Sequence, residues 1–259
     1  MGSVTQIGKT KTATFSVPHT KSVLETMMNV NEWKLPDWIC ASIGFLNIFL
    51  FFYLTTYRVL YFTVSSIFWR LLYNIGLGFL LRRQSNTNFV VEFYQSKLKH
   101  NLFFQSHIFG KPQKDIPDEY YAWLCFRKLV DIILIQDIWC FVFLAFSAIT
   151  PFGSFLSSIL RIVISIGLIG IAIFVKFNGH KLIRDFAWYW GDFFFLIDGD
   201  LVFDGVFKLA PHPMYSIGYM GHYGGALLSS SYTVFFVALF THASQILFLY
   251  LVEEPRIPI

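Results

Sequence analysis

Long apolar runs separated by polar segments dominate this chain. A bilayer-spanning helix needs about 20 predominantly apolar residues, and lipid favours helices because each unpaired backbone group there costs several kcal/mol. Four runs of that length precede the last fifty residues, near 38–57, 60–81, 129–150 and 155–175. The pattern therefore predicts an all-α, polytopic membrane protein.

The apolar stretch at residues 213–252 is too long for a single span. As one helix it would extend about 60 Å, twice the hydrocarbon thickness. Three serines, Ser229 to Ser231, lie near its middle. A turn there gives helices near 213–229 and 232–252, which together form a C-terminal helical hairpin. The chain would then have about six spanning helices, and the hairpin would return residue 254 to the side of residue 212.

The basic residues predict the orientation of these spans. Lys and Arg gather in residues 1–36, 82–128 and 176–211, whereas the short turns carry at most Arg58. Loops rich in Lys and Arg usually face the cytosol. We therefore expect residues 1–36 to form a polar cytosolic tail and residues 37–259 to form one membrane-embedded domain.

Composition agrees with a membrane protein and excludes some functions. Of the 259 residues, 55% are hydrophobic and 14% are charged, and 31 are Phe. The net charge of +4 suits lipid headgroups, so we expect no nucleic-acid partner. The three cysteines have no metal-binding spacing, and we expect no metal site.

Candidate chemistry gathers at both ends of the predicted hairpin. His212 and Pro213 stand at its start, where free N–H groups favour an acidic ligand group, although Pro is also ordinary in a first helical turn. The glycines that follow, Gly218, Gly221, Gly224 and Gly225, fit close helix packing, which we favour, or a backbone surface bared for a ligand.

Acidic residues at or inside the spans need cationic partners. Glu253 and Glu254 end the last span, although the helix dipole disfavours carboxylates at a helix C-terminus. We therefore expect this pair to meet a cation. Asp137 and Arg161 lie within the third and fourth spans at comparable depths. An ion pair between them is the expected arrangement.

Two stretches carry a family resemblance. The segment from Phe203 through His212, Pro213 and Tyr215, and the later Val252-Glu253-Glu254-Pro255, resemble the phospholipid and isoprenylcysteine methyltransferase superfamily. Within it, most of the chain is similar to the N-terminal repeat of the fungal phosphatidylethanolamine N-methyltransferases. Pro211 departs from the arginine that many relatives have there, and Lys208 is a partial substitute.

The resemblance implies a membrane enzyme of phosphatidylcholine synthesis in the endoplasmic reticulum. It would move a methyl group from S-adenosylmethionine to the amine of phosphatidylethanolamine, giving the monomethyl lipid. The implied cofactor-binding residues are His212, Pro213, Tyr215, Gly218, Gly221, Glu253 and Glu254. The fungal enzymes have two repeats, so a second catalytic half outside this chain is a candidate partner.

The chemistry requires an unprotonated amine. A lipid ammonium, like that of lysine, has a pKa of about 10 in water and must lose a proton before attack. A carboxylate or an imidazole could take that proton, and His212, His222 and Glu254 are the candidate catalytic residues. Tyr215, Tyr219 and Tyr223 could face the methyl group through cation–π contacts.

Two other functions stay open at this point. A sterol reductase that uses NADPH would need cationic groups for the extra phosphate, and only Lys208 and Arg256 lie near the motif. A non-catalytic scaffold, or a regulatory half of a larger enzyme, would use the glycines for packing alone. Replacing Glu253 or Glu254 with Ala would then leave cofactor binding unchanged.

Overall fold

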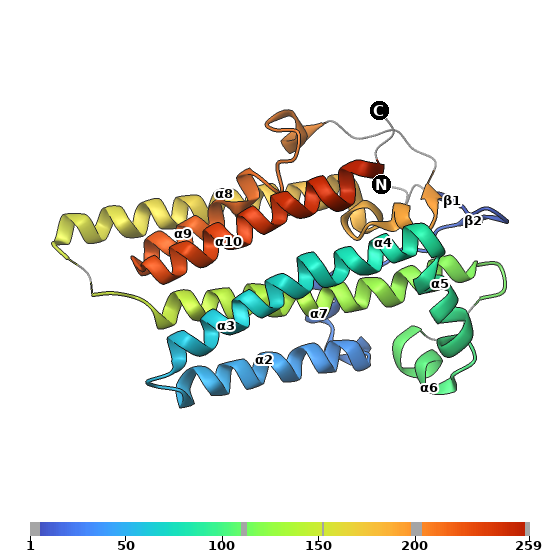
Figure 1. The fold of residues 1–259 in the computed structure, drawn as a ribbon, viewed down its shortest axis with the longest axis horizontal. Coiled ribbons are helices and arrows are strands. Elements are labelled where there is room, and N and C mark those ends of the chain that lie inside the picture. The colour runs from blue at the N-terminus through green and yellow to red at the C-terminus, as the bar shows by residue number, and fades with distance from the viewer. Residues whose placement is uncertain (1–5, 110–112, 152, 198–203, 257–259) are drawn as a thin grey trace. The chain divides into compact units, whose positions relative to one another are not determined.

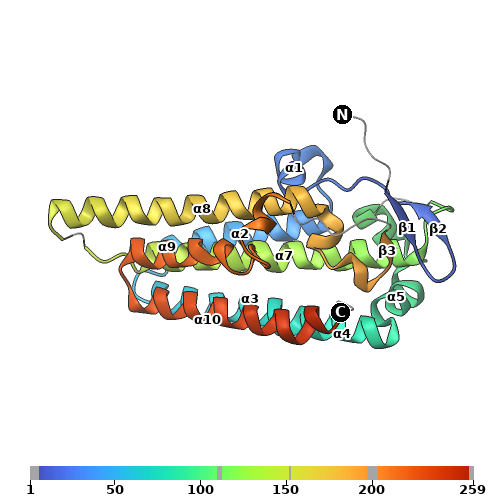
Figure 2. The same ribbon diagram turned by 90° about the horizontal axis from the view of Figure 1, so that it is seen from above.

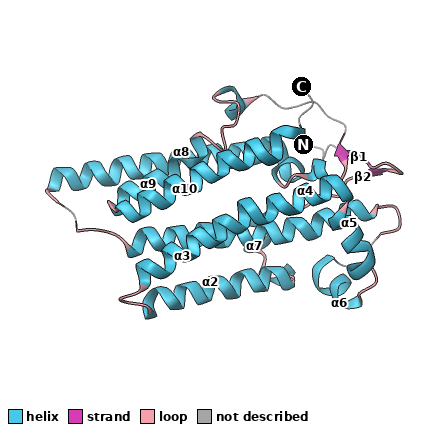
Figure 3. Cartoon of the chain, viewed as in Figure 1, coloured by secondary structure: helices cyan, strands magenta, loops and turns pink. Residues whose placement is uncertain are grey.

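Helices make up most of the described chain (Figure 3). The computed structural model describes residues 6–109, 113–151, 153–197 and 204–256. Five helical segments within these residues are long and apolar enough to cross a membrane: 35–53, 58–87, 118–147, 155–193 and 232–253. The all-α, polytopic membrane fold predicted from the apolar runs is confirmed.

The long helices are seen in Figure 1 and, turned, in Figure 2. They are α2 (Leu35–Tyr53), α3 (Arg58–Leu71) with its continuation α4 (Leu77–Thr87), α7 (Asp118–Ser147), α8 (Phe155–Trp188) and α10 (Tyr232–Phe248). The short helices are α1 (Val23–Met28), α5 (Phe89–Phe93), α6 (Leu102–Phe104) and α9 (Met220–Ser229). A π-helical segment, Leu72–Gly76, joins α3 to α4, and another, Leu249–Glu253, extends α10.

A small antiparallel sheet is the part of the fold that the sequence pattern missed. Its order is β2 (Thr14–Ser16), β1 (Ile7–Lys9) and β3 (Leu196–Ile197). Gly8 pairs with Phe15 on one side and with Ile197 on the other. Strands of two or three residues are too short for an alternating pattern to show in the sequence.

Contacts divide the chain into two compact units. Unit 1 comprises residues 1–42, 77–132 and 183–201, and unit 2 comprises residues 43–76, 133–182 and 202–259. Both predicted ends of the hairpin fall in unit 2. The division into a cytosolic tail and a membrane domain stays a prediction.

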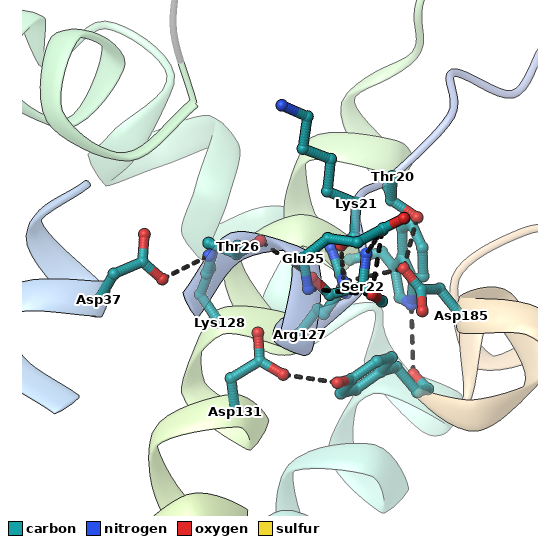
Figure 4. A network of polar contacts seen from close by, with 12 residues as sticks. Thr20, Lys21, Ser22, Glu25, Thr26, Asp37, Arg127, Lys128, Asp131 and Asp185 are labelled. Carbon is teal, nitrogen blue, oxygen red and sulfur yellow. Dashed lines mark hydrogen bonds and ion pairs between the residues drawn. The ribbon is translucent and has the colours of Figure 1, made fainter. Parts of the chain in front are cut away.

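A buried ion pair organises unit 1 (Figure 4). Arg127 of α7 lies 2.8 Å from Asp185, near the end of α8, and both side chains are buried. The Thr20 hydroxyl donates to Asp185 at 2.7 Å, and Arg127 donates to the Lys21 carbonyl at 2.5 Å. Burying this pair is costly unless its remaining hydrogen bonds are made. Thr20 and Lys21 make two of these hydrogen bonds, so they hold the N-terminal segment against α7.

The predicted C-terminal hairpin is present in unit 2. Ser230, with a left-handed φ of 52°, ends α9, and α10 starts two residues later and packs against it (Figure 1). Its first arm is shorter than the predicted 213–229. That segment begins with turns and a 3-10 helix at Ile217–Tyr219, followed by the ten residues of α9. Ten helical residues extend about 15 Å, half of the hydrocarbon thickness.

Buried apolar residues hold this hairpin to its neighbours in unit 2. The cluster draws on α3, α7, α9 and α10 and comprises Phe62, Phe141, Leu144, Ala145, Ala226, Val234, Val237 and Ala238. Each fully buried Phe, Leu or Val side chain stabilises the fold by about 1.5–3 kcal/mol. The hairpin is thus part of a packed core, which gives the residues at its two ends fixed positions.

The expected ion pair between Asp137 and Arg161 is wrong. Asp137 pairs with Arg70 of α3, and both side chains are buried. Arg161 instead donates to the Leu228 carbonyl at 2.8 and 2.5 Å, close to the end of α9. Carbonyls at a helix C-terminus lack helical partners and carry partial negative charge, so a guanidinium is favourable there. The position of a residue along a span does not say which face of the helix it occupies.

Candidate active site

The two ends of the hairpin meet through Tyr215 and Glu253. The Tyr215 hydroxyl donates to Glu253 Oε1 at 2.6 Å. Burial, together with the adjacent Glu253 carboxylate, holds the pKa of the Tyr215 phenol well above its ordinary value. Tyr215 therefore stays a hydrogen-bond donor over the physiological range, and this bond closes the hairpin where the sequence had placed a histidine and two acids.

His242 of α10 fixes the backbone that carries Tyr215. Its Nε2 lies 2.9 Å from the Tyr215 carbonyl oxygen, and its Nδ1 lies 2.9 Å from the Tyr223 hydroxyl. A carbonyl only accepts hydrogen bonds, so Nε2 must carry the proton in neutral His242. Nδ1 then accepts from Tyr223. The imidazole thereby links α9, α10 and the turn at Tyr215.

A polar cluster lies beside this turn. Arg70 donates from Nη1 to the Tyr219 hydroxyl at 3.0 Å and to Gln245 Oε1 at 3.3 Å. The Tyr219 hydroxyl also donates to Gln245 Oε1, at 3.1 Å. The Tyr219 ring stacks on His222 and on His242, with centroids 5.0 and 4.8 Å apart. Tyr219 therefore connects the buried Arg70 to the two imidazoles.

The glycines after His212 bring α9 close to α8. A Cβ on Gly221 would lie 3.1 Å from the Ala172 Cβ, and one on Gly224 would lie 2.9 Å from the Ser165 carbonyl oxygen. A side chain at Gly224 would therefore meet backbone, which cannot move aside cheaply. The close-packing interpretation holds for these two positions. Gly218 is less constrained, since its nearest neighbour would be the Lys176 side chain at 3.3 Å.

The other residues singled out in the sequence lie around these contacts. The half-buried His212 stacks on Tyr215 with ring centroids 6.4 Å apart, and Pro213 is buried. His222 packs on Phe141, with ring centroids 4.6 Å apart. Glu254 is half-buried and follows Glu253 directly.

Lys208, expected to replace the missing arginine, instead forms an exposed ion pair with Asp204. Lys208 Nζ lies 2.6 Å from Asp204 Oδ1, and the two residues are four positions apart in the chain. An exposed pair of this kind adds little stability. Lys208 therefore pairs with a residue of its own segment.

Sequence reasoning missed Arg70, Lys176, His242 and Gln245. One signal was available, because ionisable residues inside a predicted span are functional candidates by default, and Arg70 lies inside the span at 60–81. His242 and Gln245 carried no comparable signal. Their roles depend on which face of α10 meets the turn at Tyr215.

Comparison with known proteins assigns the part of the chain that carries this site. Residues 160–257 match the family described as phospholipid methyltransferase. They include Tyr215, Tyr219, His242, Gln245 and Glu253, so the hairpin and most of its polar cluster lie within the matched segment.

Curated relatives match almost the whole chain. It is 41% identical over 97% of its length to a phosphatidylethanolamine N-methyltransferase of Arthroderma otae. Relatives with the same name from Uncinocarpus reesii and Ajellomyces dermatitidis are 39% and 38% identical over 98% and 96% of it. The chain spans only 28–29% of the length of these relatives. No solved structure matches it.

Proposed function

We propose that this chain is the catalytic unit of a phospholipid N-methyltransferase. It transfers a methyl group from S-adenosylmethionine to the amine of phosphatidylethanolamine and forms the monomethyl lipid. The observation that carries this proposal is the Tyr215–Glu253 hydrogen bond, which brings the two ends of the hairpin together within the family-matched segment. The names of the curated relatives supply the substrate.

The residues at this closure fit a cationic methyl donor. S-adenosylmethionine carries a sulfonium and an ammonium, and Glu253 and Glu254 offer two half-buried carboxylates. Aromatic faces also attract cations, and Tyr215 lies at the same closure. The donor would be held by Glu253, Glu254, His212, Pro213, Tyr215, Gly218 and Gly221. When bound, S-adenosylmethionine supplies an electrophilic methyl group.

The chain's own task is to position the amine and remove its proton. Holding two reactants in line is worth many kcal/mol because it removes translational and rotational freedom before the reaction. His212, His222 and Glu254 are the proposed proton acceptors. His222 lies against Phe141 and Tyr219, whereas His212 and Glu254 belong to the opposite ends of the hairpin. Tyr215 is not an acceptor, since its raised pKa keeps it protonated.

The membrane setting follows from the substrate. Phosphatidylethanolamine resides in the bilayer, and five apolar helices of spanning length suit an enzyme that works there. We place this enzyme in the endoplasmic reticulum, as the family resemblance implies. A second catalytic half is a proposed partner, because the curated relatives are several times longer than this chain.

Purified chain in phosphatidylethanolamine liposomes with methyl-labelled S-adenosylmethionine tests this proposal. Label is expected in the monomethyl headgroup after lipid chromatography, and Glu253→Ala should abolish it. Retention of the wild-type rate by Glu253→Ala would contradict the site. Sterol reduction with NADPH in place of methyl transfer would contradict the reaction. Absence of any cofactor binding would favour a scaffold.

A further inference from the structure

Three buried polar side chains beside the candidate active site keep unmade hydrogen bonds. Arg70, Gln245 and Asn74 are 3%, 1% and 7% exposed. Within the part of the chain that the structure describes, Arg70 Nε, Gln245 Nε2 and Asn74 Oδ1 have no hydrogen-bond partner. A buried polar atom that lacks a hydrogen bond is costly to the fold. Three together indicate a polar group that binds there.

The other polar atoms of these side chains hold the three in one cluster. Gln245 Oε1 accepts from both Arg70 and Tyr219, so its amide has one favourable orientation, with Nε2 left as a free donor. Asn74 Nδ2 donates to Ser244 Oγ at 2.7 Å, next to Gln245 in the chain. Arg70 and Asn74 are four residues apart in one continuous helix. The unmade donors and the unmade acceptor are therefore neighbours with fixed orientations.

The charges around the cluster favour an anion. Lys176 of α8 lies with Nζ 5.2 Å from the Tyr219 ring centroid, and the Arg70 guanidinium lies 5.9 Å from the same centroid. Among the described residues, Lys176 makes no hydrogen bond or ion pair. Asp137 is the acid that faces both cations and bonds Arg70 directly. One positive charge is left over.

Glu253 is a further charged group near the cluster, close enough to act on Tyr73 and Tyr219. Under the proposed function its charge is balanced by the cationic methyl donor. The imidazoles of His222 and His242 also face the cluster, through the Tyr219 ring. The excess of donors and of positive charge at Arg70, Lys176 and Gln245 therefore remains.

We propose that Arg70, Lys176 and Gln245 form a subsite for the phosphodiester of the lipid substrate, an inference that rests on the proposed function. A phosphodiester is anionic and only accepts hydrogen bonds. It therefore matches the unmade donors of Arg70, Gln245 and Lys176 and the one excess positive charge. Asn74 Oδ1 is left for an N–H of the headgroup ammonium. Since the ethanolamine arm is short, a phosphate held here keeps the amine close to Tyr215 and Glu253. The subsite would thus select phospholipids over other amines.

Two variants and a matched control test this subsite in the full chain. Lys176→Met removes the unpaired cation, and Gln245→Glu keeps the oxygen that accepts from Arg70 but replaces the free donor with a negative charge. Lys181→Met changes an exposed lysine on the same helix. The KM for phosphatidylethanolamine in mixed micelles should rise about tenfold or more in both variants, as expected for one lost charge-assisted hydrogen bond. Lys176→Arg keeps the positive charge and should have a KM close to that of the wild type. Lys181→Met should not change the KM.

Binding measurements separate the sources of the anion. Calorimetry should give an unchanged S-adenosylmethionine affinity in both variants, and native mass spectrometry should show less retained phosphatidylethanolamine. Glycerophosphoethanolamine should compete with the lipid in the wild type and much less in Lys176→Met. Stronger competition by inorganic phosphate than by glycerophosphoethanolamine would contradict a headgroup subsite and indicate a free-phosphate site.

The results that overturn the inference differ from those that overturn the function. An unchanged KM and unchanged lipid retention in Lys176→Met and Gln245→Glu would mean that water alone fills the cluster. A loss of S-adenosylmethionine affinity with an unchanged lipid KM would assign the anion to the carboxylate of the donor. If the wild type retains phosphatidylethanolamine through these residues but methylates no lipid, the subsite stands and the proposed reaction fails.

Discussion

Replacing Arg70 with Met should destabilise unit 2 far more than the same change at Arg161. Arg70 and Asp137 are 3% and 2% exposed, so Arg70→Met leaves a buried carboxylate without the cation that bonds it directly. Breaking a buried pair in this way costs about 3–5 kcal/mol. Arg161→Met removes contacts to the end of α9 at a more accessible site, for which about 1 kcal/mol is expected.

Removing both partners of the pair should restore most of the loss. Replacing a buried ion pair with apolar side chains of similar volume is often neutral or even stabilising. Arg70→Met combined with Asp137→Leu is therefore expected to lie within about 2 kcal/mol of the wild type, after allowance for the bonds to Tyr219 and Gln245 that Arg70 also loses. The double-mutant cycle should give a coupling energy of several kcal/mol.

Equilibrium unfolding of the full chain in detergent micelles, followed by tryptophan fluorescence, measures these differences. A loss of unfolding free energy in Arg70→Met no larger than that in Arg161→Met would contradict a buried ion pair that stabilises unit 2. A double variant whose loss equals the sum of the two single losses would also contradict the pair, because the two residues would then act independently.

Three further outcomes are expected. His242→Phe keeps a ring against Tyr219 but loses both hydrogen bonds, so S-adenosylmethionine affinity should fall about tenfold by calorimetry. His242→Gln keeps a hydrogen-bond donor and should recover part of that affinity. Equal losses of affinity in the two variants would contradict a role of His242 in positioning Tyr215. Gly224→Val should destabilise the chain by about 1–3 kcal/mol in thermal unfolding, since its Cβ would lie 2.9 Å from a carbonyl oxygen of α8, and an unchanged stability would contradict that packing. Ser22→Ala should cost α1 about 1 kcal/mol, read from amide exchange, because Ser22 caps this helix. The Ser22 backbone N–H also donates to Glu25 and lowers the pKa of that carboxyl. The stability that this bond adds to α1 is therefore complete above the ordinary Glu pKa and is lost as pH falls through the lowered pKa. A stability of α1 that does not change across this acid range would exclude the contribution.

The sequence predicted the elements whose signal is long and repetitive. Apolar runs of spanning length mark α2, α3, α7, α8 and α10 without reference to their neighbours. The serines at 229–231 mark the hairpin turn because a forty-residue helix does not fit a bilayer. Pairing across helices was not predictable in the same way. Arg70 and Arg161 both lie within predicted spans, the expected partner was Arg161, and only the packed faces of α3 and α7 select Arg70 for Asp137.

The candidate site was predicted in outline for a similar reason. Glu253 and Tyr215 lie in the two stretches that carry the family resemblance, so their meeting could be expected once the hairpin was inferred. His242 and Gln245 sit in the middle of an apolar helix with no motif around them. Their contacts arise from the rotation of α10, which periodicity does not determine in a helix that is apolar on most sides.

The binding of S-adenosylmethionine to Glu253→Gln tests the central claim most directly. The Gln side chain still offers an oxygen to the Tyr215 hydroxyl, so the closure of the hairpin is retained while the negative charge is removed. Calorimetry on the purified full chain should show an affinity about tenfold or more below the wild type, with an unchanged unfolding midpoint. An S-adenosylmethionine affinity equal to that of the wild type would contradict a methyl-donor site at Tyr215 and Glu253.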